Sequence, residues 1–245
     1  MRIDRPWERV DELDSPRRLE RHDADLPATP HRTAVRVEAA AEHTEYRAKV
    51  DAVYRDHAID RGCERVEQIE KNVVSPAMKS IEAQDPDRHL VGFDNRLKGR
   101  DRIDEKVTKA MSERGRTAEE AFSEVKDVLR YTLQYQEDKY SSGVKDDCER
   151  LESEGFELAE FRNTWSDEEY KGINSRWRIP DSGQLFEVQF HTEASFIAKQ
   201  ETHTAYEQLR TIPPDHEQVY ELRAYQREVT AKIPVPPDAP ELSVS

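Results

Sequence analysis

Apolar residues in the early part of this chain recur at helical spacings, and no glycine-rich segment interrupts them between residues 34 and 83. This period places side chains on one face of a helix, where they can pack against a core. Ala48, Val53 and Tyr54 indicate one helix. A second helix, which Pro76 would kink, is indicated by Val66, Ile69, Val73, Met78 and Ile81. We therefore predict a helical hairpin laid over a core.

From residue 89 onward the apolar runs shorten to strand length and alternate with helical segments. Predicted strands, the first of which could be only the run-in to a strand, are 89–93, 125–135, 156–165, 170–179 and 184–192. Predicted helices are 101–111, a short helix opened by the Thr117 and Glu120 capping box, 138–154, 193–210 and 215–232. The fold class is therefore α+β, with about five strands flanked by helices and a helical N-terminal layer.

The strand around residue 188 alternates strictly between apolar and polar residues. Phe186, Val188 and Phe190 would pack a core, and the opposite face would present Glu187, Gln189 and His191. Glutamate and glutamine are not favoured in strands, and such a conflict between propensity and position often marks a functional site. The alternative is a plain amphipathic edge strand.

The composition limits how much of the chain can be core. Charged residues make up 37% of the 245 residues, and the net charge is −14. We expect solvated helices and loose ends, and divide the chain into a flexible arm (1–33), a main domain (34–210) and a C-terminal helix with a proline-rich, extended tail (211–245). The acidic balance disfavours broad binding to nucleic acid.

The two cysteines, Cys63 and Cys148, lack the spacing of a metal site or a disulfide framework and are predicted to be free thiols. No apolar run approaches the roughly 18–20 residues of a membrane span, so we expect no membrane contact. The N-terminal residues lack the apolar region of a secretory signal. We expect a cytoplasmic protein, and leave open both delivery as a secreted effector and a homo-oligomer.

Two groups of residues could bind a nucleotide. Basic residues are concentrated before and within the helix at 101–111, where they would suit a polyphosphate near a helix N-terminus: Arg96, Lys98, Arg100, Arg102 and Lys106. One face of the strand at 170–179 carries Tyr170, Gly172, Asn174, Arg176 and Arg178, which would suit a stacked base and bound phosphates. The alternative for both groups is a solvated surface.

Asp127 stands at the start of an apolar strand, where an acid is disfavoured. Paired in space with Glu187, it could hold Mg²⁺, which takes one or two carboxylates and completes its shell with phosphate and water. Lys199, His203 and Glu207 are spaced by four on the next helix, and a helix surface explains that spacing equally well. The sequence contains no P-loop, GxGxxG, HExxH or GxSxG motif.

Taken in order, these segments resemble the synthetase domain of the RelA/SpoT family of alarmone synthetases, which are nucleotide 3′-pyrophosphokinases. The similarity covers about residues 90–210. The matching segments are Arg96-Leu97-Lys98 with Lys106, Val125–Arg130, Glu169–Asn174, Glu187–Thr192 and His203.

The resemblance implies a mixed sheet flanked by helices, a nucleotidyltransferase-like synthetase domain. It also implies transfer of the β,γ-pyrophosphate of ATP to the 3′-hydroxyl of a purine nucleotide, giving AMP and a (p)ppGpp- or (p)ppApp-type product. Asp127 and Glu187 would bind Mg²⁺, and Gln189 would position the 3′-hydroxyl. The residues expected at ATP are Arg96, Lys98, Arg102, Lys106 and Arg130. Those expected at the acceptor are Tyr170, Lys171, Asn174, Arg176 and His203.

The chain departs from the family pattern mostly on the acceptor side. Glu169 stands for a glycine, Asn174 for a histidine, His191 for an arginine, Arg130 for a glycine and Thr132 for an arginine. These departures leave the acceptor base open and give His191 no definite role. Two alternatives remain: a catalytically degenerate module that binds alarmones or nucleotides, and a toxin-type synthetase acting on adenine nucleotides or tRNA ends.

Overall fold

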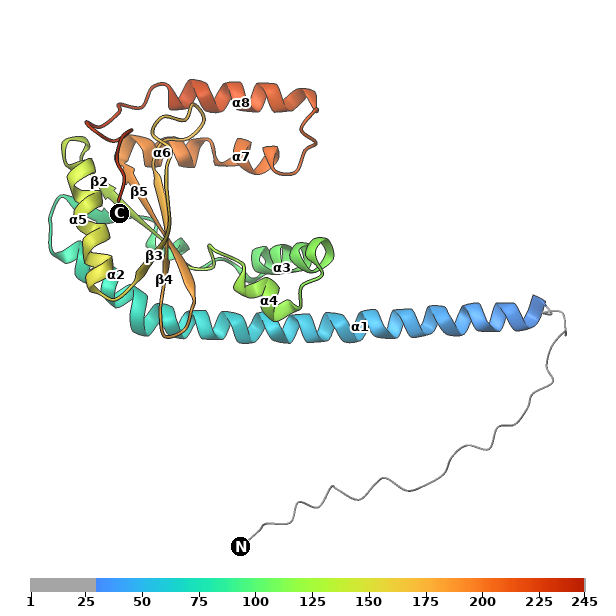
Figure 1. Ribbon diagram of the computed structural model, residues 1–245. Coiled ribbons are helices and arrows are strands. Elements are labelled where there is room, and N and C mark those ends of the chain that lie inside the picture. The colour runs from blue at the N-terminus through green and yellow to red at the C-terminus, as the bar shows by residue number, and fades with distance from the viewer. Residues whose placement is uncertain (1–29, 245) are drawn as a thin grey trace, which may run out of the picture. The chain divides into compact units, whose positions relative to one another are not determined.

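A mixed β-sheet of five strands forms the centre of the second of two units, Met1–Lys49 and Val50–Ser245, into which the chain divides. The computed structural model describes residues 30–244, and their side chains from residue 41 (Figure 1). The strands are β1 (Arg88–Leu90), β2 (Arg130–Tyr135), β3 (Glu157–Asn163), β4 (Ile173–Arg178) and β5 (Leu185–Thr192). The helices are α1 (Pro30–Ile69), α2 (Ser75–Ala83), α3 (Arg100–Arg114), α4 (Ala118–Ser123), α5 (Tyr140–Ser153), α6 (Glu193–Glu201), α7 (His203–Leu209) and α8 (Glu217–Thr230).

The strand order is β1-β2-β5-β4-β3, so the strand with the alternating pattern lies at the centre of the sheet. Strands β2 and β5 are parallel, and the other neighbours are antiparallel. A tight turn joins β4 to β5, with the Gly183 amide donating to the Ile179 carbonyl at 2.7 Å. The predicted mixed sheet with flanking helices is confirmed, and the alternative of an edge strand for residues 186–192 is wrong.

One face of the sheet is apolar and is covered by α5. Phe186, Val188 and Phe190 of β5 are fully buried there, and the Tyr140 hydroxyl of α5 donates to the Phe190 carbonyl at 2.9 Å. Helix α6 follows β5 directly and contacts the opposite, polar face, as its contacts with Gln189 and His191 show. The two faces are therefore covered by different helices, and the polar face is the one that can hold a site.

The helical N-terminal layer is present, but the predicted hairpin is wrong. Helix α1 runs from Pro30 to Ile69, continues into a π-helical turn, η1 (Glu70–Val74), and then into α2. The chain has no reverse turn between residues 30 and 83, because no glycine or proline breaks the helical pattern before Pro76, which α2 accommodates in its first turn. Of the predicted arm, residues 1–29 lie outside the described residues, and α1 begins at Pro30.

Several local predictions are confirmed, and others are shifted. The Thr117 capping box opens α4, with the Glu120 amide donating to the Thr117 hydroxyl. The helix predicted over 193–210 is divided at Thr202 into α6 and α7. Two 3₁₀ turns, η2 (Phe93–Asn95) and η3 (Glu137–Lys139), complete the elements.

The C-terminal tail was predicted to be extended, but it contains turns. It folds into turns whose apolar residues Ala239 and Leu242 are buried in the core. The Asn163 amide donates to the carbonyls of Ala239 at 2.7 Å and Leu242 at 3.0 Å. Proline spacing alone does not reveal this packing, since the partners, Asn163 at the end of β3 and Ser141 of α5, are distant in the sequence.

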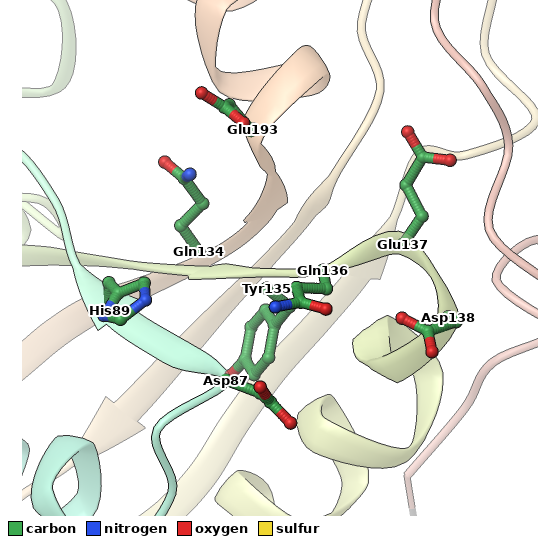
Figure 2. Close-up of a pocket in the computed structure, with 8 residues that line it drawn as sticks. All are labelled: Asp87, His89, Gln134, Tyr135, Gln136, Glu137, Asp138 and Glu193. Carbon is green, nitrogen blue, oxygen red and sulfur yellow. The ribbon is translucent and has the colours of Figure 1, made fainter.

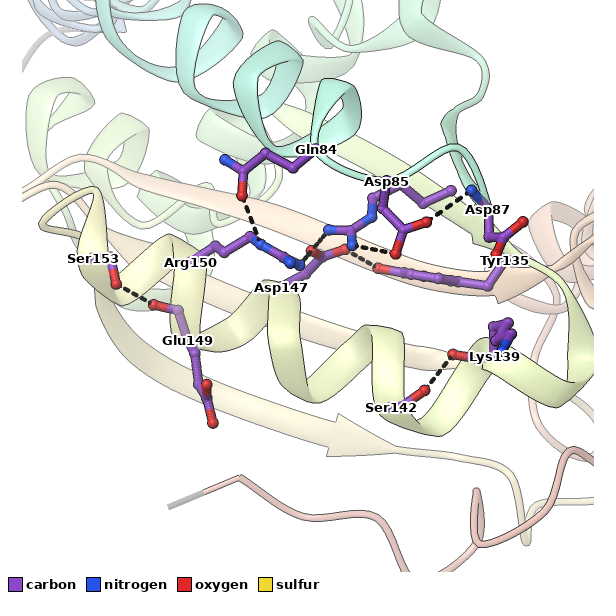
Figure 3. A network of polar contacts seen from close by, with 11 residues as sticks. Gln84, Asp85, Asp87, Tyr135, Lys139, Ser142, Asp147, Glu149, Arg150 and Ser153 are labelled. Atoms are coloured by element: carbon purple, nitrogen blue, oxygen red, sulfur yellow. Dashed lines mark hydrogen bonds and ion pairs between the residues drawn. The ribbon is translucent and has the colours of Figure 1, made fainter.

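A buried ion-pair network joins β1, β2 and α5 (Figure 3). The Arg88 guanidinium contacts the Asp147 carboxylate, and both side chains are almost completely buried. Asp147 also accepts from the Tyr135 hydroxyl at 2.6 Å and from Arg150 at 2.8 Å. The Arg88 and Asp147 side chains are buried, so each depends on the other to offset the cost of burying its charge.

Among residues 30–244, no helix combines the length and the apolar character that a membrane crossing requires.

Candidate active site

The polar face of the three central strands gathers the predicted site residues into two rows. The strand register places Glu187 of β5 between Arg130 of β2 and Arg176 of β4. The next row places Gln189 between Thr132 and Asn174. Directly opposite residues on neighbouring strands lie about 4.5–5.5 Å apart between Cβ atoms, so each row is a contiguous set of functional groups.

Alternation alone suggests that this polar face is exposed to solvent, but in the structure its side chains are buried. Glu187 is 7% exposed, Gln189 is 6% exposed and His191 is completely buried. Helix α6 covers them, because Thr192 caps its N-terminus and turns the chain back over the strand that it has just left. The carboxylate of Glu187 is therefore held in a protected site.

Burial raises the pKa of Glu187, and the negative charge of Asp127 acts in the same direction. Arg130, Arg176 and Lys199 oppose this shift. The Gln189 amide donates to Glu187 Oε1 at 2.6 Å, which fixes the orientation of the carboxylate. A buried carboxylate with a second one nearby gains from a bound cation, because a cation relieves both the burial cost and the repulsion.

Asp127 does not lie in a strand, contrary to the prediction. It occupies the turn before β2, which begins three residues later at Arg130. Its two carboxylate oxygens accept from the ammonium groups of Lys98 at 2.9 Å and Lys106 at 2.7 Å. Burial alone would raise the pKa of Asp127, but the hydrogen bonds from these two lysines outweigh it and hold that pKa below its usual value.

The backbone explains why the basic segment reaches Asp127. Leu97 forms a bridge with Leu129, and the Lys98 amide donates to the Val128 carbonyl at 2.9 Å. The segment that carries Lys98 thus runs beside the turn that carries Asp127, and α3 then brings Lys106 back to the same carboxylate. The structure brings these three predicted site residues together.

Arg96 is held by a residue that sequence reasoning missed. Its Nε donates to Glu70 Oε1 at 2.6 Å, and its guanidinium stacks on the Phe93 ring at 4.3 Å. Glu70 belongs to the π-helical turn η1, and such turns often occur at functional sites. One signal was available: Glu70 falls at helical spacing between Val66 and Val74, on the buried side of the helix.

Tyr170, which was predicted at the acceptor, is held against His191. The Tyr170 hydroxyl lies 2.9 Å from His191 Nε2 and 3.1 Å from Asn174 Oδ1, and burial raises its pKa. His191 Nδ1 lies 2.8 Å from the Ser195 hydroxyl of α6. Gly172 has a φ of 153°, and a Cβ there would lie 2.7 Å from His191 Cε1, so only glycine admits this packing.

His191 makes the stability of the fold depend on pH. Burial, then Lys199 and Arg130, lower its folded pKa well below the ordinary 6.5. Above about pH 6.5 both folded and unfolded chains carry the neutral ring; below it only the unfolded chain takes up the proton. We expect the free energy of unfolding to fall by up to about 1.4 kcal/mol per pH unit below that point.

Urea denaturation between about pH 7.5 and about pH 5.5 measures this loss. His191→Gln should flatten the profile, whereas His43→Gln, at an exposed position on α1, should keep the wild-type slope. Equal slopes in the wild type and His191→Gln would contradict the assignment.

Some predicted ligands are placed elsewhere. Arg102 is exposed and pairs with Glu105 at 3.1 Å and Glu207 at 3.6 Å. His203 is exposed at the start of α7. Arg176 borders Glu187 in the register, but its guanidinium contacts Glu160 of β3.

Lys171 also lies outside the group that the structure brings together. Its ammonium donates to the carbonyls of Trp165 at 2.7 Å and Asp167 at 2.6 Å, so it holds the loop before β4. Helix α8 holds the same loop from outside, since Arg227 donates to Glu169 at 3.1 Å. The loop that carries Tyr170 is therefore fixed from both sides.

Lys199 is the second residue that sequence reasoning did not place in the site. Its ammonium donates to Gln189 Oε1, while Gln189 Nε2 donates to Glu187. The spacing of Lys199, His203 and Glu207 drew attention to this helix, but a helical repeat does not show which turn faces the sheet. Burial, then Arg130, lower the pKa of Lys199 to about 8.

A pocket of about 450 Å³ opens farther along the same sheet (Figure 2). Its lining residues are Asp87, His89, Gln134, Tyr135, Gln136, Glu137, Asp138 and Glu193. Four carboxylates line it, so its potential disfavours a phosphate. The predicted site residues lie outside this pocket, in the rows around Glu187 and at the turn that carries Asp127.

For the predicted Mg²⁺, Asp127 and Glu187 would supply two carboxylate ligands and no more. Among the described residues, no group of three or more histidine, cysteine, aspartate or glutamate side chains is arranged to hold a metal. Mg²⁺ accepts one or two carboxylates when phosphate and water complete its shell. Burial is the main cause of the raised pKa of Glu187, and the charge of Asp127 adds to that shift.

No known family model and no curated protein matches the sequence. Solved structures do show similarity. A GTP pyrophosphokinase family protein from Streptococcus pneumoniae aligns with a TM-score of 0.44 and 15% identity, over 77% of this chain and 88% of that one. The chain is similar to small alarmone synthetases.

Small alarmone synthetase 1 from Bacillus subtilis, bound to its product pppGpp, aligns with a TM-score of 0.43 and 17% identity, over 76% of this chain and 92% of that one. Small alarmone synthetase 2 from the same organism gives a TM-score of 0.46 and 12% identity, over 72% and 90%. These names belong to the family that the sequence resembles. At such scores the likeness supports no function by itself, so the residues of the site must do so.

Proposed function

We propose that this chain is an ATP-dependent pyrophosphokinase that transfers the β,γ-pyrophosphate of ATP to the 3′-hydroxyl of a purine nucleotide. The observation that carries the proposal is the grouping of a buried carboxylate, Glu187, with the Asp127, Lys98 and Lys106 cluster beside one sheet face. Phosphoryl transfer depends on positioning and on charge stabilisation, and this group supplies both kinds of residue.

The reaction breaks the bond between the β-phosphorus and the oxygen that bridges it to the α-phosphate. The 3′-oxygen of the acceptor forms the new bond to the β-phosphorus, AMP leaves, and the hydroxyl proton is released. Lys98, Lys106 and Arg96 would hold the phosphates of ATP. Gln189, whose amide is fixed between Glu187 and Lys199, would position the 3′-hydroxyl.

Asp127 and Glu187 would hold Mg²⁺, which when bound neutralises charge on the phosphates and orients them. The raised pKa of Glu187 means that burial works against its charged form, so a cation would stabilise that form. Tyr170, fixed by His191 and Asn174, would offer its ring to the acceptor base.

The test is incubation of the purified protein with ATP, Mg²⁺ and each of GDP, GTP, ADP and AMP in turn, followed by chromatography. We expect AMP and a 3′-pyrophosphorylated nucleotide in equal amounts with at least one acceptor. Release of ADP and phosphate in place of AMP would show ordinary hydrolysis and contradict the proposal.

A second candidate is a nucleotide-binding module without turnover. One observation favours it: both carboxylate oxygens of Asp127 are already engaged by lysines, which leaves less freedom for a metal. Calorimetric titration with nucleotides, with and without Mg²⁺, separates the two. Tight binding that Mg²⁺ does not change, with no AMP formed, supports the module.

A further inference from the structure

Lys199 is a largely buried cation without a carboxylate partner. Its ammonium contacts the neutral amide of Gln189 and the ring of Phe196, whose centroid lies 5.4 Å from Nζ. Within residues 41–244, no carboxylate oxygen lies within ion-pair distance of its ammonium. A buried ammonium costs free energy unless an opposite charge is near, so a site for an anion is indicated.

Arg130 is the second cation in this position. The register places it beside Glu187, and its charge acts on both Glu187 and Lys199. In the described part of the chain its guanidinium forms neither a hydrogen bond nor an ion pair, whereas Arg176, on the other side of Glu187, is held by Glu160. Arg130 and Lys199 therefore repel each other across the site with only Glu187 to offset them.

The balance of charge among these side chains favours an anion. Lys98 and Lys106 supply two positive charges to the single negative charge of Asp127, and Arg176 is matched by Glu160. This leaves Glu187 as one negative charge against Arg130 and Lys199. A bound anion would remove the repulsion between the two cations, and phosphoryl oxygens accept from both ammonium and guanidinium donors.

We propose that Lys199 and Arg130 together bind the pyrophosphoryl group, placing it beside Gln189. The identity of this group rests on the proposed function, but the anion site itself does not. Arg130 lies in the row of Glu187 and Lys199 contacts Gln189 in the next row, so the anion lies where transfer would occur and not at a distant phosphate. The Lys199 ammonium also donates to Gln189 Oε1. The amide hydrogens of Gln189 are then available to Glu187 and to the 3′-oxygen of the acceptor nucleotide.

The test is calorimetric titration with inorganic pyrophosphate, which requires no turnover. Lys199→Met keeps the length of the side chain and removes its charge, and it should weaken binding about 10- to 100-fold, as expected for a lost hydrogen bond to a charged group. Lys199→Arg should stay within about threefold of the wild type. Lys145→Met, on the exposed side of α5, is the matched control and should not change the affinity.

A second variant guards against a folding defect. Arg130→Met, on a different element, should weaken pyrophosphate binding to a similar degree, and thermal unfolding of each variant checks that it folds. Unchanged affinity in folded Lys199→Met, or no pyrophosphate binding by the wild type, would overturn the inference. Pyrophosphate binding that depends on Lys199 without AMP formation from ATP would instead refute the proposed function and leave the anion site standing.

Discussion

Glu187→Gln should lower kcat/KM for pyrophosphate transfer about 10³-fold, equivalent to about 4 kcal/mol of transition-state stabilisation. The substitution keeps the size of the side chain and its hydrogen bond from Gln189, since an amide oxygen can accept in place of Oε1. Only the negative charge is lost. If that charge binds a cation at the transferring phosphate, the loss falls on the chemical step.

The same variant should not lose stability. The pKa of Glu187 is raised by burial, so the folded state disfavours its charge, and a neutral isostere removes that cost. We expect an unfolding midpoint equal to or above that of the wild type. Substitution of a residue with a structural role would instead lower activity and stability together.

The measurement is AMP release over a range of ATP concentrations, combined with urea denaturation of the same samples. Glu157→Gln, at an exposed position of β3, is the matched control and should change neither quantity. Wild-type activity in Glu187→Gln would remove this carboxylate from the proposed chemistry. A joint loss of activity and stability would assign it a structural role.

The largest effect on stability is expected from Asp147→Ala, at about 3–5 kcal/mol. Removing this carboxylate leaves the buried Arg88 guanidinium without its main partner, and the Tyr135 hydroxyl without an acceptor. Asp85, at 2.8 Å from Arg88, remains and offsets only part of the loss. Buried charges without partners are among the few causes of changes this large.

Asp146→Ala, one residue earlier on α5 and exposed, should change stability by no more than about 0.5 kcal/mol. Urea unfolding of both variants decides the question. The double variant Arg88→Met with Asp147→Leu should recover much of the loss, because an apolar pair needs no counter-charge. A loss below about 1 kcal/mol in Asp147→Ala would show that the pair contributes little.

Local patterns predicted the elements of this fold better than their contacts. The alternation around Val188 identified β5 and its apolar face, and the Thr117 capping box identified the start of α4. Each of these two patterns is contained in a short stretch of sequence. The predicted hairpin in the N-terminal layer failed because apolar spacing shows where helix forms, and only a breaker shows where it stops.

The site could be predicted in part. Glu187, Gln189, Asp127, Lys98 and Lys106 were identified from the sequence. The structure joins Asp127 to the two lysines and Glu187 to Gln189. Other contacts depend on tertiary packing that no local pattern records. Glu70 reaches Arg96 through a π-helical turn, Lys199 reaches Gln189 because α6 folds back over β5, and Arg88 finds Asp147 across 59 positions.

The position of β5 has a consequence for the synthesis of the chain on the ribosome. This strand forms the middle of the sheet, yet it is the last of the five to be made. Until it emerges, β2 and β4 each lack the neighbour that pairs with one of their edges. Such unpaired edges favour aggregation, and pairings between distant segments form slowly. The two halves of the sheet, β1 with β2 and β3 with β4, are therefore joined only after this late strand has been made.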